Sequence, residues 1–339
     1  MQQHLEALKD SKHCPLWHDL AERPEELPSL SKNEECELLI VGGGFTGLWA
    51  ALQAKERAPE ANIILIEQTF IGDGASGRNG GFINSSLAHG ETNTEYQFPG
   101  EAEKLYNLGQ QNMTELLASL EKYGIDADYE AVGETEVATN QGAVDALRKD
   151  FEEEVAEGDD VVWFDQAEMQ AQVNSPTYLA GLWRKGDQNG IVNPIKICWG
   201  LKRVLLELGV RIFENTSLDD VKPLNKTQMQ AYIGSHTIIA DKVLMATNGF
   251  TSCLSKIRQS VIPVWDYQIA TEPLTNEQLE AIGWHKTRHA LGNHANMFHY
   301  YRMTKDNRIT WGGGGAVRYY YGSNTDKKQC ADIPERFEQ

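Results

Sequence analysis

The chain's regular patterning begins with two short apolar runs on either side of a helical pattern. Residues 37–41 and 62–66 are apolar runs of the length expected for buried strands. Between them, apolar residues recur at spacings of three and four from residue 45 to about residue 57, which predicts an amphipathic helix. A strand, a helix and a second strand within about 30 residues have the length of a βαβ unit. The sequence therefore predicts such a unit here.

The rest of the chain mixes helical and strand patterns. A long amphipathic helix is predicted over residues 101–124, another around 142–155, and a third from Pro194, a residue suited to a first helical turn, to residue 208. The pattern indicates an α/β or mixed α+β fold. The expected strands are 134–138, 211–215, 228–232, 237–239, 242–246, 263–271, 297–303 and 308–313.

Composition narrows the classes of function. The chain has 49 acidic against 31 basic residues and a net charge of −18, which repels phosphate backbones and argues against nucleic-acid binding. The simplest explanation of this charge is solubility. A more specific alternative is that it attracts a cationic substrate such as an amine. No apolar stretch is long enough to span a bilayer, and the start of the chain lacks an apolar signal core. The five scattered cysteines suit reduced thiols, so we expect a cytoplasmic protein without a metal site.

The first apolar run leads into GGGFTG, which fits the G-x-G-x-x-G pattern of dinucleotide-binding turns. Gly42 permits the tight turn, Gly44 lets the backbone approach a pyrophosphate, and Gly47 lets the helix pack closely on the sheet. The helix then starts at Phe45 and Thr46, where free N–H groups and the positive end of the helix dipole favour phosphate. A purely structural glycine turn is the alternative.

An acid and a second glycine cluster follow. Glu67 lies 20 residues after Gly47 at the end of the second run, where a carboxylate can bind ribose hydroxyls and disfavours NADP. Residues 72–81 then contain several glycines together with Ser76, Arg78 and Asn79, which are donors suited to an anion or a heteroaromatic edge. A flexible linker is the alternative, and the turn alone does not decide between FAD and NAD.

VGGGFTGLWAA, the acid at 67 and GASGRNGG together resemble the D-amino-acid-oxidase-like (DAO) family of FAD-dependent oxidoreductases, and within it the γ-glutamylputrescine-oxidase-like branch. The resemblance runs from about residue 36 to about residue 318. It implies a Rossmann-like FAD-binding domain of the glutathione-reductase-like type with an interleaved, mixed-sheet substrate domain. Family members continue further with another glycine-rich segment, so we expect the chain to be a fragment. The implied division is an arm (1–36), an FAD-binding domain (37–90 and 191–255), a substrate domain (91–190 and 256–328) and a tail (329–339).

The resemblance also implies a set of cofactor contacts. Noncovalent FAD would be held at its pyrophosphate by the glycine turn and at its ribose by the acid. Residues 76–81 would line the flavin. The segment that contains Leu218 would touch the adenine through main-chain atoms, and the turn at Thr247 and Asn248 would return to the cofactor. The residues concerned are Gly42, Gly44, Phe45, Thr46, Gly47, Glu67, Ser76, Arg78, Asn79, Gly80, Gly81, Leu218, Thr247 and Asn248.

The implied reaction is oxidation of the C–N bond of an amine or amino acid to an imine. A hydride equivalent passes to flavin N5, and oxygen or another acceptor reoxidises the flavin. Arg302 is the candidate for gripping a substrate anion, with a surface or ion-pair arginine as the alternative. Tyr300 and Tyr301 point to opposite faces of a strand, and motif position favours Tyr301 for the site. An NAD-dependent dehydrogenase and a non-catalytic flavin-binding protein are the competing functions.

Overall fold

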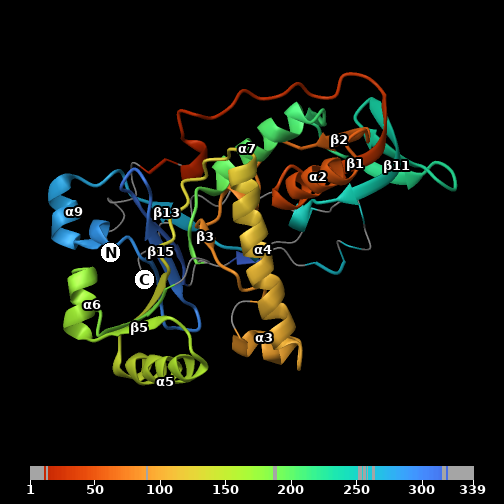
Figure 1. Cartoon of the computed structure of the whole chain (residues 1–339). Coiled ribbons are helices and arrows are strands. Elements are labelled where there is room, and N and C mark those ends of the chain that lie inside the picture. The colour runs from red at the N-terminus through yellow and green to blue at the C-terminus, as the bar shows by residue number, and fades with distance from the viewer. Residues whose placement is uncertain are drawn as a thin grey trace.

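The computed structural model of the 339-residue chain describes two large sheets and two small ones (Figure 1). The described residues are 11–12, 14–88, 91–185, 189–250, 254, 257, 259–261, 264–314 and 318–319.

The six-stranded sheet has the order β8-β2-β1-β11-β10-β9. Strands β8, β2, β1 and β11 run parallel, and β10 and β9 extend the sheet antiparallel. The helix predicted after the glycine turn is present, and with it the expected βαβ unit. The bounds are β1 (Glu34–Val41), α2 (Phe45–Arg57), β2 (Ile63–Ile66), α7 (Pro194–Glu207), β8 (Arg211–Phe213), β9 (Asp220–Pro223), β10 (Met229–Ile233) and β11 (His236–Met245).

Two features of this sheet differ from expectation. The strands expected at 237–239 and 242–246 are one strand, β11, because β1 pairs with it in one register from Glu34 opposite Ile238 to Val41 opposite Met245. For the same reason β1 starts inside the segment expected to be an arm. Each residue of β2 is buried, since α2 and α7 cover one face and the other face forms a second apolar cluster.

The seven-stranded sheet has the order β13-β16-β15-β14-β4-β6-β5. Helices α6 and α9 contribute to the apolar cluster on one part of it, and α5 packs against β4, β5 and β6. The strand expected at 263–271 is two short strands. The bounds are β4 (Glu134–Ala138), α5 (Gln141–Glu157), β5 (Val161–Phe164), α6 (Gln166–Gln172), β6 (Ala180–Arg184), β12 (Val264–Trp265), β13 (Gln268–Ala270), α9 (Asn276–Ile282), β14 (Ala290–Asn293), β15 (His299–Met303), β16 (Ile309–Gly313) and β17 (Arg318–Tyr319).

The remaining elements join the two sheets. The long helix α4 crosses the middle of the molecule, and the N-terminal arm runs from a short helical turn, η1, along one edge to β1 (Figure 1). None of the helices in the described ranges is long and apolar enough for a membrane span. The domain division stays a prediction, and its tail lies outside the described residues. The bounds are η1 (Leu16–His18), η2 (Ala75–Gly77), β3 (Phe82–Ile83), α3 (Glu91–Gln97), α4 (Ala102–Lys122), β7 (Gly190–Ile191), η3 (Asn248–Phe250) and η4 (Trp284–Lys286).

Candidate cofactor and active site

The glycine turn between β1 and α2 is closed by main-chain atoms. Gly42 has a φ of +113°, and a Cβ there would collide with the carbonyl oxygen of Ala246 at the end of β11. A Cβ on Gly47 would collide with the carbonyl oxygen of Gly42. The amide of Ala246 donates to the carbonyl of Val41, so the chain enters Thr247 beside this turn. Both glycines are therefore required by close approach, as the pattern predicts.

The start of α2 presents main-chain donors. Gly44 is the N-cap in extended conformation, and a Cβ there would meet only the Ser76 side chain, with its Oγ at 2.8 Å. The amide of Leu48 donates to the Gly44 carbonyl, and the amide of Phe45 donates to Ser76 Oγ at 2.9 Å. Within the described residues this leaves the amides of Thr46 and Gly47 for another acceptor. Such donors at a helix N-terminus fit a phosphate.

Glu67 ends β2 beside this turn. Its Oε2 accepts from the Gly43 amide at 2.7 Å and its Oε1 from the Thr69 amide at 3.0 Å. Burial raises the pKa of this carboxyl, and the two amide bonds oppose the rise. The carbonyl of Glu67 accepts from the Thr216 amide at 2.8 Å, so the segment containing Leu218 starts beside the acid. The structure thus brings the ribose, phosphate and adenine candidates together.

The second return segment follows β11. Thr247 comes directly after Ala246, and Asn248 begins η3 with a φ of +46°, a conformation that asparagine tolerates better than most residues. Both residues make contacts within the protein. Their position next to Gly42 agrees with a segment that returns to the cofactor.

The cluster at 72–81 is an ordered loop, and its polar side chains are used within it. The Arg78 guanidinium turns back to Asp73, with its Nη2 at 2.9 Å from Oδ1. The Asn79 Nδ2 donates to the Ser76 carbonyl at 2.9 Å, and its Oδ1 accepts from the Gly81 amide at 2.9 Å. These contacts show that Arg78 and Asn79 help to hold the loop, and their expected contact with the cofactor stays a prediction.

Three groups from outside hold the far end of the loop. Trp17 of η1 donates its Nε1 proton to the Asn79 carbonyl at 2.7 Å. The Gly81 carbonyl accepts from the Val192 amide at 2.8 Å and from Arg302 Nη1 at 3.3 Å. Sequence analysis did not include Trp17 among the candidate site residues. An isolated tryptophan in the arm gave no signal that it reaches this loop.

Arg302 lies on β15 with its side chain covered. It is 3% exposed, and its Cζ lies 5.0 Å from the centroid of the Trp17 ring. Its Nε has no hydrogen-bond partner in the described part of the chain, and burial lowers the pKa of the guanidinium to about 10, so the group stays charged at neutral pH. A grip on a substrate anion stays a prediction for this residue. The contacts that the structure provides are with the loop and with Trp17.

The two neighbouring tyrosines lie on opposite faces of β15, and it is Tyr300, not the expected Tyr301, that lies beside the glycine loop. Tyr301 is 2% exposed, stacks on Trp311 at 3.9 Å and hydrogen-bonds the Tyr178 hydroxyl, so it belongs to the core under the helices. Tyr300 points to the other face, where a Cβ on Gly80 would lie 3.0 Å from its ring. Strand alternation is as predicted, but the choice of Tyr301 to line a site does not fit this burial.

The face that carries Tyr300 also carries two glycines and an acidic side chain. Gly292 and Gly312 lie opposite Tyr300 on the two neighbouring strands. On β4, Glu134 reaches over Gly292, with its Oε1 3.9 Å from where a Cβ would be. No hydrogen bond or ion pair to this carboxylate occurs among the described residues, and burial raises its pKa. Sequence reasoning did not single out Glu134, because only the pairing of distant strands places it here.

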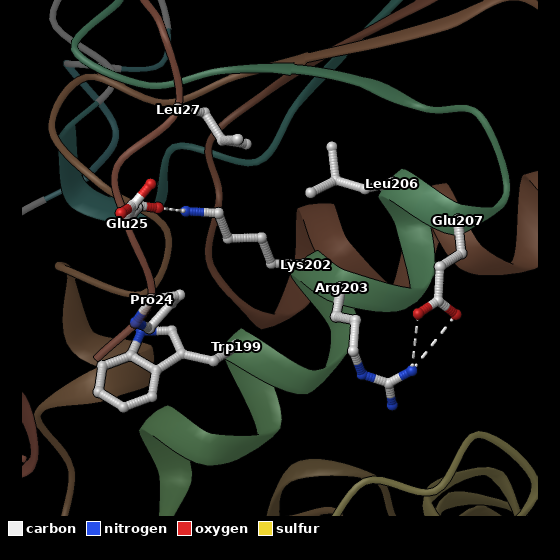
Figure 2. Close-up of a pocket in the computed structure, with 8 residues that line it drawn as sticks. All are labelled: Pro24, Glu25, Leu27, Trp199, Lys202, Arg203, Leu206 and Glu207. Carbon is white, nitrogen blue, oxygen red and sulfur yellow. Dashed lines mark hydrogen bonds and ion pairs between the residues drawn. The ribbon is translucent and has the colours of Figure 1, made fainter. Parts of the chain in front are cut away.

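A separate hollow of about 290 Å³ lies between the arm and α7. Lys202 crosses one side of it and donates to the Glu25 carbonyl at 2.9 Å (Figure 2). No predicted site residue lines the hollow, so it is not part of the cofactor site. Its lining residues are Pro24, Glu25, Leu27, Trp199, Lys202, Arg203, Leu206 and Glu207.

Comparisons with known proteins agree with this site. The family model described as FAD dependent oxidoreductase (DAO) matches residues 37–338. The chain belongs to the DAO family. FAD is the cofactor of this family, and the glycine turn, the helix donors and the acid fit its ADP portion. The expected resemblance, fold class and cofactor are thereby confirmed.

Individual relatives of this DAO protein share less than 30% of its residues. It is 27% identical to a probable oxidoreductase OrdL of Haemophilus influenzae over 87% of this chain and 69% of that protein. It is 24% identical to γ-glutamylputrescine oxidoreductase of Escherichia coli over 84% of this chain and 66% of that protein. The crystal structure of glycine oxidase from Geobacillus kaustophilus superposes with a TM-score of 0.67 at 16% identity, covering 86% of this chain and 73% of that one. The chain thus spans about two thirds of its curated relatives.

Proposed function

We propose that this DAO-family protein oxidises the C–N bond of an amine or amino acid to an imine, which water then hydrolyses. When bound, FAD supplies the acceptor for the hydride equivalent removed from the carbon that bears the nitrogen. Oxygen or another acceptor takes the electrons afterwards. The similarity to γ-glutamylputrescine oxidoreductase supports an amine substrate.

The cofactor contacts expected from the sequence become part of this proposal. The pyrophosphate is placed at the start of α2, the ribose at Glu67, the adenine along the main chain near Leu218, and the flavin along the loop that ends at Gly81. What supports this placement is that the structure gathers these segments around one helix N-terminus. The discontinuous FAD-binding and substrate domains are proposed on the same basis.

The observation that carries the choice of an amine is that the Glu134 carboxylate has no hydrogen-bond or ion-pair partner among the described residues. A partly buried carboxylate without a donor is costly, and a substrate ammonium group would compensate it. Gly292 has no side chain between this carboxylate and Tyr300, which is the neighbour on the far side of that glycine. The net charge of −18 also favours the approach of a cation.

Tyr300 is positioned to orient the substrate. Its hydroxyl donates to Asp266 Oδ2 at 2.6 Å and accepts from Gln268 Nε2 at 3.1 Å. Burial, and then the neighbouring Asp266 carboxylate, raise the pKa of Tyr300, so its hydroxyl stays protonated at neutral pH. A ring fixed in this way fills one wall of the site beside the loop and limits how the substrate carbon can lie.

Loss of the flavin's visible absorption without oxygen tests the proposal. Diamines, N-substituted amino acids, α-amino acids and 2-hydroxy acids are added in turn to the FAD-loaded protein. Amines or amino acids should bleach the flavin. If only 2-hydroxy acids do so, the protein oxidises C–O bonds instead, and if nothing does, a non-catalytic flavoprotein becomes the better interpretation.

Glu134→Gln separates substrate binding from the later steps. Loss of a charge-assisted contact worth about 1.5–3 kcal/mol should raise the KM for a cationic amine about tenfold or more, with kcat changed much less. Glu153→Gln, an exposed acid paired with Lys149 on α5, is the matched control. An unchanged KM in Glu134→Gln would remove the main support for an amine at this face.

A further inference from the structure

We propose that Trp17 of the N-terminal arm is a positioning residue of the flavin site. Together with Arg302 it fixes the main chain of residues 79–81, where we place the flavin. The inference goes beyond the proposed reaction, because it concerns how the loop is held and not what is oxidised. It rests on the proposed position of the flavin along this loop.

The loop needs external support because glycine is frequent in it. Gly72 and Gly81 have φ values of +83° and +73°, and glycine loses more conformational entropy on ordering than any other residue. Side chains of the loop itself fix its first part, through Arg78 with Asp73. The carbonyls at its far end are bound from outside instead. One of these bonds comes from Trp17, 62 residues earlier in the chain.

Trp17 and Arg302 support each other as well as the loop. The indole is 5% exposed and the arginine 3%, and the guanidinium carbon lies 5.0 Å from the centre of the ring. No carboxylate lies within ion-pair distance of Arg302 in the described part of the chain, so the ring face is a principal favourable contact for its charge. Substituting either residue should therefore loosen both bonds to the loop.

The next residue of η1, His18, packs against the glycine loop and so helps to fix the position of Trp17. His18 is 6% exposed, packs edge-on against Phe70 at 5.1 Å, and places its Nε2 2.9 Å from where a Cβ on Gly77 would lie. Further along the arm, the Leu30 amide donates to Thr216 Oγ1 at 3.1 Å, beside the adenine segment. The arm is thus attached at both ends of the proposed FAD site.

The test uses the full chain loaded with FAD. Trp17→Phe keeps an aromatic ring for Arg302 and removes the indole N–H together with part of the bicyclic ring, a loss of volume that the control variant below shares. We expect FAD to dissociate about 2- to 10-fold more readily, the range of one hydrogen bond, and the visible circular dichroism of the bound flavin to change. Arg302→Met should change the same spectrum, and Arg302→Lys should restore it in part.

Trp199→Phe is the control, because Trp199 lines the hollow on the other side of the arm. Its FAD affinity and flavin spectrum should match those of the unmodified chain. If Trp17→Phe is indistinguishable from this control in both readouts, Trp17 is only a core residue and the inference is overturned. An unmodified chain that binds no FAD overturns it too. Failure of amine oxidation, by contrast, leaves both binding readouts measurable, so the two proposals fail separately.

Discussion

Replacement of Glu214 should destabilise the protein more than replacement of almost any surface acid. This carboxylate follows β8, and its side chain is 1% exposed. Oε2 accepts from Lys202 Nζ at 2.8 Å and from the Leu27 amide, and Oε1 accepts from the Ile71 amide at 2.7 Å. One side chain therefore joins α7, the arm and the segment that leads into the glycine loop.

The magnitude follows from what Glu214→Gln leaves behind. The amide side chain can still accept from main chain, but Lys202, itself 6% exposed, loses its only carboxylate partner among the described residues. Breaking a buried ion pair by removing one partner costs about 3–5 kcal/mol. For a chain of this length each kcal/mol lowers Tm by roughly 2 °C, so a decrease of about 6–10 °C is expected.

Thermal unfolding of the FAD-free and FAD-saturated protein, followed by circular dichroism, measures this effect. The double variant Glu214→Gln with Lys202→Met keeps an acceptor for the main chain, removes the isolated charge and should recover a large part of the loss. Because Ile71 leads into the loop, Glu214→Gln should also weaken FAD binding. A Tm within about 1 °C of the unmodified chain, or no recovery in the double variant, would refute the assignment of a buried, coupled pair.

Other substitutions test the site more directly. Gly42→Ala should abolish FAD binding, because a Cβ would collide with the Ala246 carbonyl at a φ of +113°; equilibrium dialysis with FAD measures it. Tyr301→Phe should lower Tm by about 2 °C, through a lost buried hydrogen bond of about 1 kcal/mol, and leave KM unchanged, whereas Tyr300→Phe should change KM and hardly affect Tm. Burial lowers the pKa of His289 to about 4, so the unfolded chain binds more protons between about pH 6.5 and 4 and stability should fall as pH falls through that range. His289→Gln should flatten this part of a Tm-against-pH profile.

Sequence alone predicted well those elements that are determined by residues close together in the chain. The helix expected from residue 45 to about 57 is observed as α2 (Phe45–Arg57), because its apolar spacing and the glycine turn before it lie in one short segment. The fold family followed from the same turn together with Glu67 and the second glycine cluster. Strand β11 was divided in two because only its partner β1 shows that one register continues on both sides of residue 241.

The assignment of polar side chains to the site could not be made in this way. Alternation along β15 correctly placed Tyr300 and Tyr301 on opposite faces, but which face packs under α6 and α9 depends on the whole sheet. Arg302 carried a plausible chemistry, yet its contacts are with Gly81 and Trp17, neither of them near it in the chain.

The pattern of apolar residues and glycines was sufficient to predict the βαβ unit and its phosphate-binding turn, because short-range backbone geometry and periodic burial determine both. Only tertiary structure decided that the N-terminal arm holds the loop at residues 79–81, that Tyr300 faces this loop, and that Glu134 lies beside Gly292 without a partner among the described residues. Each of these facts depends on the docking of segments far apart in sequence, and burial and hydrogen-bond partners exist only after that docking.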